Sequence, residues 1–566
     1  MSTSRWLPTR DARQHERILK DCSNAGVDKE LTTKLFNTKI YNHLNFNSIN
    51  KFKLFPLALA ALAFSACTSE DVADNSPVNG EGTRSYVAVN INNVGSSGTR
   101  AGEVYENGNA KENKIEKVRF YFFTQNGEPY KMTDGTNWKE ISPVTGNGQN
   151  EPNIERITDA MLVIDGATKA APYSMMAVVN PETIETNVLK NLMSKSAVEA
   201  AISKQNFKQN GNDVTDFVMS NSVYADGGQK VWASNISGYV QTTAEAATAK
   251  PVDIFVERVA VKIMTTTSNM SELGDATKVY EVGETTTGKK VYAKINGWGI
   301  ANENDNANLV KQISLNWNDD NLGFAAGSSW NIPAYKRCFW EESPRFTATN
   351  KSWNEYSTTT DKPYYTLPNT TFIPKYVVAA QLVYADGNAA EICSYKGVEY
   401  LSENDVKNAI LNENKTFFKK NGNDYNNLAA TDIVFYVDAN NSYEVRAKLA
   451  EGVVVYKKTA DSWVDATAEA KTSLAKDAAR IYKSGMTYYY TNIKHLGAAG
   501  KTAEYGLVRN HIYKIDVTNI KGFGTPVYDP DHKFDPVIPE DVKTYLAAKL
   551  NVLSWRVVSQ SVELGK

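Results

Sequence analysis

Residues 85–94 read SYVAVNINNV, and this stretch has the two-residue period of a β-strand. Val87, Val89 and Ile91 fall on one face, whereas Ala88 and two asparagines fall on the other. A strand with one apolar face buries that face against a hydrophobic core. The segment therefore predicts a half-buried strand near the beginning of a β-rich fold.

Two polar linkers flank this strand. Residues 68–84 read TSEDVADNSPVNGEGTR, and residues 95–100 read GSSGTR. Both are too rich in Ser, Asn, Asp, Gly and Pro to bury a core, so we expect them to be disordered. Each linker ends in an arginine, Arg84 or Arg100, and both are therefore candidates for proteolytic cleavage.

The rest of the chain repeats the strand pattern. Its 566 residues include 30 Tyr and 20 Phe, and short apolar runs alternate with turn signals such as Asn126-Gly127. These features predict an all-β fold of the sandwich type with a few short helices. The predicted strands lie at residues 117–130, 173–180, 253–264, 290–300, 376–387, 431–449 and 511–520.

Two segments have helical patterns instead. Residues 183–204 place Ile184, Val188 and Leu192 four residues apart, which predicts an amphipathic helix. Ser402 and the acidic residues that follow it predict the start of a second, short helix in capping-box fashion. We expect both helices to cover sheet edges and loops.

Residues 51–67 read KFKLFPLALAALAFSAC and have the organisation of a secretory signal peptide. The apolar run at residues 54–64 is far shorter than the roughly 20 residues that span a bilayer. It leads into FSAC at residues 64–67, which resembles a lipobox with Phe64 where Leu is usual. The resemblance implies cleavage before Cys67 and a diacylglyceryl anchor of the palmitate type on its thiol, and a buried structural cysteine is the alternative.

Residues 1–50 are charged and polar, and they precede a signal that ought to begin the protein. We interpret them as an upstream extension from a start codon assigned too early, with a true leader as the alternative. Under the first interpretation, His15, Cys22 and His43 are absent from the protein.

Charge and motif content narrow the class of protein. The chain has 62 Lys+Arg against 64 Asp+Glu and no basic block, so we exclude nucleic acid as a partner. It has no glycine-rich phosphate loop, paired CxxC, HExxH or GxSxG elbow. The remaining histidines are His495, His511 and His532, and their spacing does not allow two of them to bind one metal ion from a single helix or strand. His511 lies in a strand-like run, where a histidine is usually structural. Adjacent Glu341 and Glu342 would point to opposite faces of a strand. We therefore predict no enzymatic activity, no cofactor and no metal site.

Two interpretations remain open for the cysteines and for the acidic clusters. Cys338 and Cys393 either form a disulfide or are buried free thiols. Acidic clusters around Asp305 and at residues 529–535 contain ligands that suit calcium, but neither matches an EF-hand loop, so we expect solvated turns.

The C-terminal region carries a family resemblance. Residues 505–530 read YGLVRNHIYKIDVTNIKGFGTPVYDP, and residues 545–564 read YLAAKLNVLSWRVVSQSVEL. Together they resemble the Bacteroidales fimbrillins, the type V pilins, and are most similar to the major subunit of the short, Mfa-type fimbriae. Segments nearer the N-terminus are similar in order and spacing, namely residues 115–123, 173–181, 217–222 and 256–263.

This resemblance implies two transthyretin-like β-sandwich domains in tandem. We expect an N-terminal domain at residues 101–266 and a C-terminal domain at residues 267–566. Residues 51–67 would be the signal peptide and lipobox, and residues 68–100 a propeptide that contains the removable strand.

The family also implies cleavage at the cell surface by an arginine-specific protease. By position, Arg100-Ala101 resembles the cleavage site, and Arg84 is the rival. A cut after Arg100 releases the strand at residues 85–94, whereas a cut after Arg84 leaves it in place. Only the first cut leaves unpaired backbone groups beside an apolar groove.

In this family the C-terminal segment of a neighbouring subunit is expected to fill that groove. Here the donor strand would be residues 549–564, which are rich in β-forming residues. These residues alternate in two sets, Leu553, Trp555 and Val557 in the first and Val558, Val562 and Leu564 in the second, with Val552 beside them. We expect the segment to change face at a β-bulge between the sets. The contact would be head-to-tail and would therefore repeat as a filament.

The resemblance thus predicts a structural stalk subunit of a surface fimbria that supports adhesion, biofilm formation and virulence. Its partners would be copies of itself, the fimbrial anchor and tip subunits, the arginine-specific protease, and host or bacterial surface receptors. The lipid would hold the precursor in the cell outer membrane, and the cleaved protein would belong to the extracellular fimbrium.

Two alternative functions remain open. A tip, accessory or anchor subunit would share the sandwich, but a tip needs no donor strand and an anchor keeps its leader uncut. A surface glycan-binding or glycan-cleaving lipoprotein would show clustered exposed aromatic residues beside paired carboxylates about 5 to 10 Å apart. Nothing in the sequence predicts that pairing of carboxylates.

Overall fold

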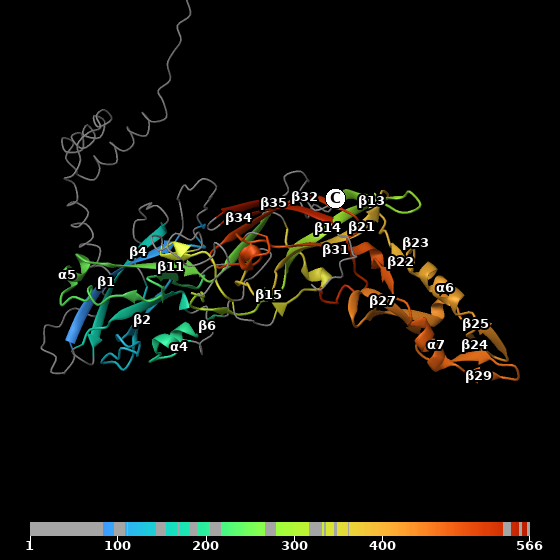
Figure 1. Ribbon diagram of the computed structural model, residues 1–566, viewed down its shortest axis with the longest axis horizontal. Helices are drawn as coiled ribbons and strands as arrows, with labels where there is room; N and C mark the ends of the chain where they lie inside the picture. Colours follow the sequence, from blue (N-terminus) through green and yellow to red (C-terminus); the bar gives the residue numbers. More distant parts are fainter. Residues whose placement is uncertain are drawn as a thin grey trace, which may run out of the picture. The chain divides into compact units, whose positions relative to one another are not determined.

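We describe the fold from a computed structural model of the chain (Figure 1). The structure describes residues 83–94, 108–109, 111–142, 154–166, 170–181, 189–203, 217–266, 279–315, 331–332, 336–343, 348–359, 362–497, 499–535, 545–553 and 557–562. Outside them lie residues 1–50, the predicted signal peptide with Cys67, the predicted cleavage site Arg100-Ala101, and Trp555 and Leu564 of the predicted donor strand. No helix within the described ranges is both long enough and apolar enough to span a membrane.

The N-terminal part of the described chain forms one eight-stranded sheet. Its strand order is β3-β2-β5-β7-β11-β1-β4, and β10 pairs with β5. The strands are β1 (Thr83–Val94), β2 (Val118–Phe123), β3 (Trp138–Ile141), β4 (Ile154–Gly166), β5 (Ser174–Val179), β7 (Met219–Asn221), β10 (Ser234–Asn235) and β11 (Val252–Arg258). We call it the first sheet.

The first sheet is buried on both faces at β2, and the aromatic run of this strand shows why. Successive side chains of a strand point to opposite faces. Phe120 and Phe122 therefore pack in one core, whereas Tyr121 and Phe123 pack in the core on the other side. The second core is completed by residues from much later in the chain, including Leu309, Phe339, Trp340 and Val508.

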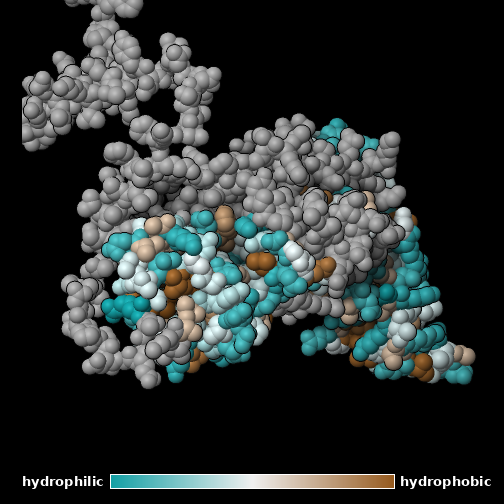
Figure 2. Space-filling model, turned by 60° about the vertical axis from the view of Figure 1, so that its left-hand side comes forward, coloured by the Kyte–Doolittle hydropathy of each residue, from teal (hydrophilic) through white to brown (hydrophobic). Residues whose placement is uncertain are grey.

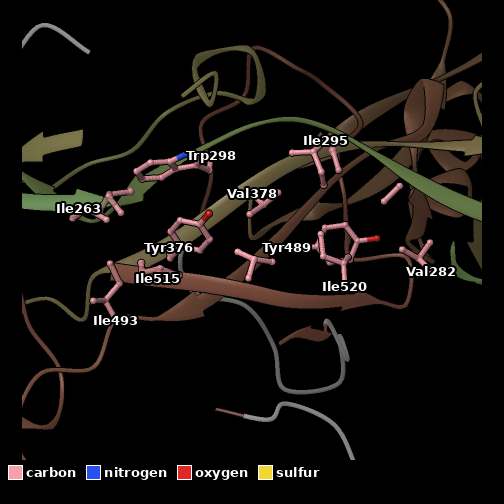
Figure 3. Close-up of a cluster of buried hydrophobic side chains, with 14 of the residues drawn as sticks. Ile263, Val282, Ile295, Trp298, Tyr376, Val378, Tyr489, Ile493, Ile515 and Ile520 are labelled. Carbon is pink, nitrogen blue, oxygen red and sulfur yellow. The ribbon is translucent and has the colours of Figure 1, made fainter. Parts of the chain in front are cut away.

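The second β-structure is a sandwich of two five-stranded sheets. One has the order β20-β12-β32-β34-β35 and the other β13-β14-β21-β31-β33. The first contains β12 (Val261–Thr266), β20 (Tyr364–Thr366), β32 (Ile512–Lys521), β34 (Tyr545–Leu553) and β35 (Val557–Val562). The second contains β13 (Val279–Glu284), β14 (Lys290–Ala301), β21 (Lys375–Tyr384), β31 (Met486–Asn492) and β33 (Thr525–Pro526). Figure 3 shows the core between the sheets, where Ile263, Ile515 and Ile520 of one sheet lie against Trp298, Tyr376 and Tyr489 of the other.

A third set of strands lies in the chain between β21 and β31, and we call residues 393–481 the inserted module. One sheet contains β22 (Cys393–Tyr395), β23 (Val398–Tyr400), β26 (Ile433–Asp438), β27 (Asn441–Leu449) and β30 (Ala479–Ile481). The other contains β24 (Phe418–Asn421), β25 (Asp424–Asn427), β28 (Val455–Lys458) and β29 (Trp463–Asp465). The module has its own hydrophobic core, which includes Val406, Phe417, Val455 and Leu474. This core was not expected within a single C-terminal domain.

Four two-stranded ladders also occur in the described chain. They are β8 (Tyr224–Asp226) with β9 (Gln229–Val231), β16 (Ala307–Asn308) with β6 (Ile202–Ser203), β15 (Glu303–Asn304) with β19 (Ala348–Thr349), and β17 (Asn331–Ile332) with β18 (Arg337–Cys338).

The helices of the described chain are short. They are α4 (Lys195–Glu199), α5 (Ala244–Thr248), α6 (Glu403–Glu413) and α7 (Thr467–Leu474), with 3-10 turns η4 (Trp353–Glu355), η5 (Ala430–Asp432), η6 (Lys483–Gly485) and η7 (Thr502–Glu504). The predicted all-β, sandwich-type fold with a few short helices is therefore confirmed. The predicted start of α6 is also confirmed, because the Ser402 hydroxyl accepts a hydrogen bond from the Asp405 amide.

The helix predicted at residues 183–204 is wrong in its described part. Leu192 has a φ of 53°, a left-handed conformation that interrupts a right-handed helix. Ser194 then caps α4, which has five residues, and the chain continues as β6. The apolar spacing instead docks Leu189 and Met193 against the second core of the first sheet.

The chain passes from the first sheet to the sandwich at residues 259–260, between β11 and β12. The expected domain boundary lay a few residues later, after β12, and residues 267–278 lie outside the described chain. β12 belongs to the sandwich because it pairs in parallel with β32. On the face drawn in Figure 2, the coloured surface is mainly hydrophilic, and its hydrophobic residues form separate spots.

Candidate assembly site

The predicted removable strand lies inside the first sheet rather than on its edge. β1 pairs in parallel with β11 from Val89 to Asn93. On its other side it pairs antiparallel with β4 along Thr83–Val94. Because β4 follows β1 at the end of the strand order, β1 is what joins β4 to the rest of the sheet.

The apolar face of β1 is buried as its alternation predicts. Val87 is 0% exposed and Val89 is 1% exposed, and both belong to the core that also contains Val118, Leu162 and Ile254. The backbone of Ile91 continues the strand opposite Ile254. Loss of β1 would thus uncover a row of apolar positions spaced two residues apart.

The beginning of β1 is tied down by further contacts. The Arg84 guanidinium donates to the Asp165 carboxylate at 3.0 Å, and this interaction raises the pKa of Arg84 above its ordinary value. Arg84 and Asp165 are also partners in the β1–β4 ladder. The Tyr86 amide donates to the Gln241 carbonyl, and the Gln241 amide donates to the Tyr86 carbonyl.

The far end of β11 is anchored by a buried ion cluster. Glu257 is 1% exposed, and its carboxylate lies 2.7 Å from Lys311 Nζ and 2.7 Å from Arg337 Nε. Lys311 Nζ also donates a hydrogen bond to the Cys338 carbonyl at 2.7 Å. Glu257 directly follows the stretch of β11 that pairs with β1, so the cluster fixes the strand that lies beside β1.

The neighbouring Arg258 is also buried and extends this network. Its Nε donates to the Glu112 carbonyl at 2.8 Å, and its Nη1 donates to Asn510 Oδ1 at 3.0 Å. The Glu112 carboxylate accepts from Lys262 Nζ at 2.7 Å and from the Tyr365 hydroxyl at 2.6 Å. The contacts link the loop before β2 to the end of β11, to β12 and to the chain before β32.

A further buried ion pair involves Glu341, one of the two glutamates considered in the sequence. The Arg509 backbone amide and Nε donate to its carboxylate at 2.7 and 2.8 Å. The other Arg509 nitrogens donate to the carbonyls of Asn308 and Leu309. Glu341 is therefore engaged in holding the chain before β32 against the segment that covers the first sheet.

Two of the histidines lie together in this buried region. His511 Nδ1 donates to the Arg509 carbonyl at 2.8 Å, and Nε2 has no hydrogen-bond partner in the described chain. Burial and the positive charge of Arg337 hold the pKa of His511 well below its ordinary value. His495 contacts the Tyr513 hydroxyl and the Phe339 carbonyl. His532 is exposed on a turn.

The segment predicted as donor strand is paired within its own chain. β34 pairs antiparallel with β32, and β35 pairs antiparallel with β34 from Leu553 to Ala548. Val552 and Leu553 lie in β34, and Val557, Val558 and Val562 lie in β35. β35 has no second neighbour within the described strands, so it is the edge of its sheet.

The remaining predicted residues take other places. Cys338 and Cys393 are buried free thiols in different hydrophobic cores, and burial raises the pKa of each thiol to about 12. The two cysteines are therefore free thiols and do not form the disulfide that the sequence left open. In the ranges that the structure describes, no three His, Cys, Asp or Glu side chains gather in a way that could hold a metal ion.

Sequence reasoning missed the buried ion cluster. Its members are far apart in the chain, since Glu257 meets Lys311 and Arg337, and Glu341 meets Arg509. A usable signal existed in the run VERVAVKI at residues 256–263, where charged residues interrupt a stretch that is otherwise apolar. Charges in such a run are buried only when they are paired.

Comparison with known proteins assigns the C-terminal region. Residues 480–561 match the family model described as "Major fimbrial subunit protein type IV, Fimbrillin, C-terminal". The matched region runs from β30 to β35 and so contains β31 to β34, among them β32, the strand on which the C-terminal hairpin pairs. A search of curated proteins finds no match.

Several solved structures are similar at low sequence identity. A fimbrilin from Porphyromonas gingivalis W83 has 13% identity and a TM-score of 0.35, with 84% of this chain and 98% of that chain covered. The tip fimbrial protein Mfa3 from Porphyromonas gingivalis has 10% identity and a TM-score of 0.29, with 83% and 100% covered. A fimbrial assembly protein from Parabacteroides distasonis ATCC 8503 has 10% identity and a TM-score of 0.29, with 67% and 100% covered. The resemblance to fimbrillins predicted from the sequence is thus confirmed for residues 480–561, which match a fimbrillin C-terminal region.

Proposed function

We propose that this fimbrial subunit is the stalk pilin of a surface fimbria and polymerises by exchange of β1 for the C-terminal strand of a neighbouring copy. The observation that carries the proposal is the position of β1 between β11 and β4. A strand removed from the inside of a sheet leaves two unpaired edges that face each other. An incoming strand can therefore form backbone hydrogen bonds on both of its sides.

The side chains of β1 support the same exchange. Val87 and Val89 are buried, and burying two such side chains contributes about 3 to 6 kcal/mol. An incoming strand would recover this free energy if it presented apolar residues at the same two-residue spacing. Leu553, Trp555 and Val557 have that spacing, whereas the second set is interrupted by Gln560.

The walls of the groove have different anchors. β11 is held at its end by the ion cluster of Glu257 with Lys311 and Arg337, and none of these three residues is a partner of β1 in the β1–β11 ladder. Once β1 is absent, β4 loses its neighbour in the strand order, and it keeps the bridge from Gly166 to Met132, the hydrogen bond from the Thr133 amide to the Asp165 carbonyl, and the packing of Leu162 in the core. We infer that β11 stays in place after cleavage and acts as the template, and that β4 closes over the new strand.

The C-terminal hairpin can supply the donor by giving up two ladders. β35 is bonded on one side only, to β34, whereas residues 549–553 of the donor lie in β34 and also pair with β32. At a net value of about 1 kcal/mol per hydrogen bond, the bonds of a strand that pairs on both sides in the groove offset this loss. The exchange therefore depends on the apolar burial that the incoming strand recovers.

The place of Arg84 supports cleavage after Arg100. A protease binds its substrate in an extended conformation with free backbone groups, and the backbone of Arg84 is already paired with Asp165 in β4. Cleavage after Arg84 would also leave β1 in place. Arg100 lies beyond the end of β1, so cleavage there frees the whole strand together with Cys67 and its lipid anchor.

This mechanism implies a lipidated precursor in the outer membrane, an arginine-specific surface protease, and neighbouring copies, anchor and tip subunits as partners. Surface receptors would make the fibre an adhesive structure. The role of the chain is structural rather than catalytic. A subunit that polymerises through its own C-terminal strand is a stalk subunit rather than a tip subunit.

The test is to incubate the purified precursor with a trypsin-like protease and to look for an SDS-resistant ladder of oligomers. We expect the wild-type chain to give the ladder. Arg100→Ala and truncation before Lys549 should each abolish it, because the first keeps β1 in place and the second removes the donor. A ladder that persists in both variants contradicts the mechanism.

Arg84→Ala is the matched control for the cleavage site. It removes an arginine from the same propeptide and leaves Arg100 available, so the ladder should remain. Loss of the ladder in Arg84→Ala with retention in Arg100→Ala would assign the cut to Arg84 and leave β1 in the subunit.

A further inference from the structure

The inserted module has a sheet whose outer face is rich in aromatic side chains. The sheet has the order β25-β24-β28-β29, and its strands are labelled in part in Figure 1. Its inner face packs on the module core through Phe417, Leu428 and Val455. Because side chains alternate along a strand, the neighbours of these residues point to the opposite face.

Four aromatic residues occupy that outer face, and they form the feature that we call the aromatic face. Phe418 and Tyr456 are partners in the β24–β28 ladder, and both are half-buried. Tyr425 and Trp463 stack with ring centroids 4.0 Å apart and an angle of 5° between the rings. Phe418 meets Trp463 edge to face at 5.0 Å, and Tyr425 meets Tyr456 edge to face at 5.4 Å.

Two lysines on the aromatic face form no ion pair with any residue of the described ranges. Lys420 is the ladder partner of Tyr425, and Lys458 is the ladder partner of Trp463. Both are exposed, and neither has a carboxylate partner among the residues that the structure describes. Positive charge is therefore placed beside the aromatic rings without an ion pair to neutralise it in the described chain.

The lysines next to them in the chain behave differently. Lys419 lies on the inner face and pairs with Asp432 at 2.6 Å. Lys457 also lies on the inner face and pairs with Glu469 at 2.8 Å. The contrast shows that the strands place one lysine of each adjacent pair in an ion pair and leave the other available beside the aromatic rings.

We propose that the aromatic face binds a carbohydrate that carries carboxylate groups. The C–H face of a sugar ring is apolar and flat enough to pack on an aromatic ring, which buries apolar surface on both partners. The sugar carboxylate would then meet Lys420 or Lys458, whose charge is complementary to it. Uronic acids and sialic acids share this chemistry.

The same face is built for binding rather than for hydrolysis. Glycoside hydrolysis uses two carboxyl groups on either side of the bond. The strands of this sheet place Asp465 on the outer face, opposite Tyr456, and its carboxylate is engaged by the Thr467 amide at the start of α7. The aromatic face therefore offers ring surfaces and positive charge without an acid pair.

The experiment compares the binding of four probes to the full chain by titration calorimetry. A hyaluronan decasaccharide supplies uronic acid, 3′-sialyllactose supplies sialic acid, lactose is the neutral control, and polyglutamate supplies carboxylates without sugar. We expect at least one acidic sugar to bind about tenfold or more tightly than lactose, which corresponds to about 1.4 kcal/mol. Which of the two acidic sugars binds identifies the source of the carboxylate.

Matched double variants test the role of the two lysines. Lys420→Gln with Lys458→Gln should remove the advantage of the acidic sugar over lactose. Lys419→Gln with Lys457→Gln removes the same charge from the same strands on the inner face and should retain that advantage. Both doubles change surface side chains, so their folding can be verified by the temperature of thermal unfolding.

A third variant tests the rings. Trp463→Ala should weaken binding of the acidic sugar by about tenfold or more, provided that thermal unfolding shows the module intact. The proposal is overturned if neither acidic sugar binds, or if the two lysine double variants show the same affinity for the acidic sugar relative to lactose. It is also overturned if polyglutamate binds as tightly as the acidic sugar. The last result would mean that the face attracts negative charge of any kind.

Discussion

Replacing the two buried valines of β1 by alanine should destabilise the precursor and leave the fibre unchanged. Val87 is 0% exposed and Val89 is 1% exposed. Each substitution removes two methyl groups, at roughly 0.8 kcal/mol for each buried carbon, and leaves a cavity in addition. The double variant should therefore lose roughly 4 to 6 kcal/mol of unfolding free energy.

The measurement has two parts. Urea denaturation of the uncleaved chain gives the free energy of unfolding of the precursor. Heating of the protease-generated oligomers in SDS gives the temperature at which the ladder dissociates. Because the proposed cleavage releases β1, the double variant should lower the first quantity and leave the second at its wild-type value.

Val256→Ala is the matched control. Val256 lies in β11, is 0% exposed, and belongs to the same core as Val87 and Val89, but it stays in the subunit after cleavage. It should therefore weaken both the precursor and the oligomer. If the double variant in β1 also lowers the dissociation temperature of the ladder, β1 is still seated in the fibre and the reasoning fails.

Three further predictions concern the packing around this groove and the inserted module. Glu257→Gln should cost roughly 3 to 5 kcal/mol in urea denaturation, because it leaves Lys311 and Arg337 buried without their shared carboxylate; a loss below about 1 kcal/mol would contradict the ion cluster. The pKa of His511 is lowered well below 6.5, so its stabilising effect is present above pH 6.5 and is lost as the pH falls, by up to about 1.4 kcal/mol per pH unit. Unfolding free energies of the wild type and His511→Phe, measured from pH 7 to pH 5, should therefore converge on acidification, and parallel curves would refute this assignment. Ser402→Ala should remove the cap of α6 and cost about 1 kcal/mol, whereas an unchanged unfolding free energy would show that the cap contributes nothing.

The sequence predicts local structure well where the pattern is short-range. The alternation of Val87 and Val89 predicts the face of β1 that packs in a hydrophobic core, and the capping box at Ser402 predicts where α6 begins. Both depend on residues within a few positions of each other. The apolar spacing at Leu189 and Met193 also depends on near neighbours, but there the side chains dock on a distant core and the helix does not form.

The sequence could not predict what the fold brings together from afar. Glu257 finds its partners at Lys311 and Arg337 only because segments beyond the first sheet fold back over it. Likewise, Tyr425 and Trp463 stack although 38 positions separate 425 from 463. No spacing rule links such pairs, since the sheet order that joins them is a property of the whole chain.

The most direct test of the central claim is the structure of the assembled fibre, determined by electron cryomicroscopy. We predict that the strand between β11 and β4 of each subunit belongs to residues 549–564 of the next subunit, with density for the side chain of Trp555 as the marker. Density for residues 85–94 in that position, continuous with the same subunit, would contradict strand exchange.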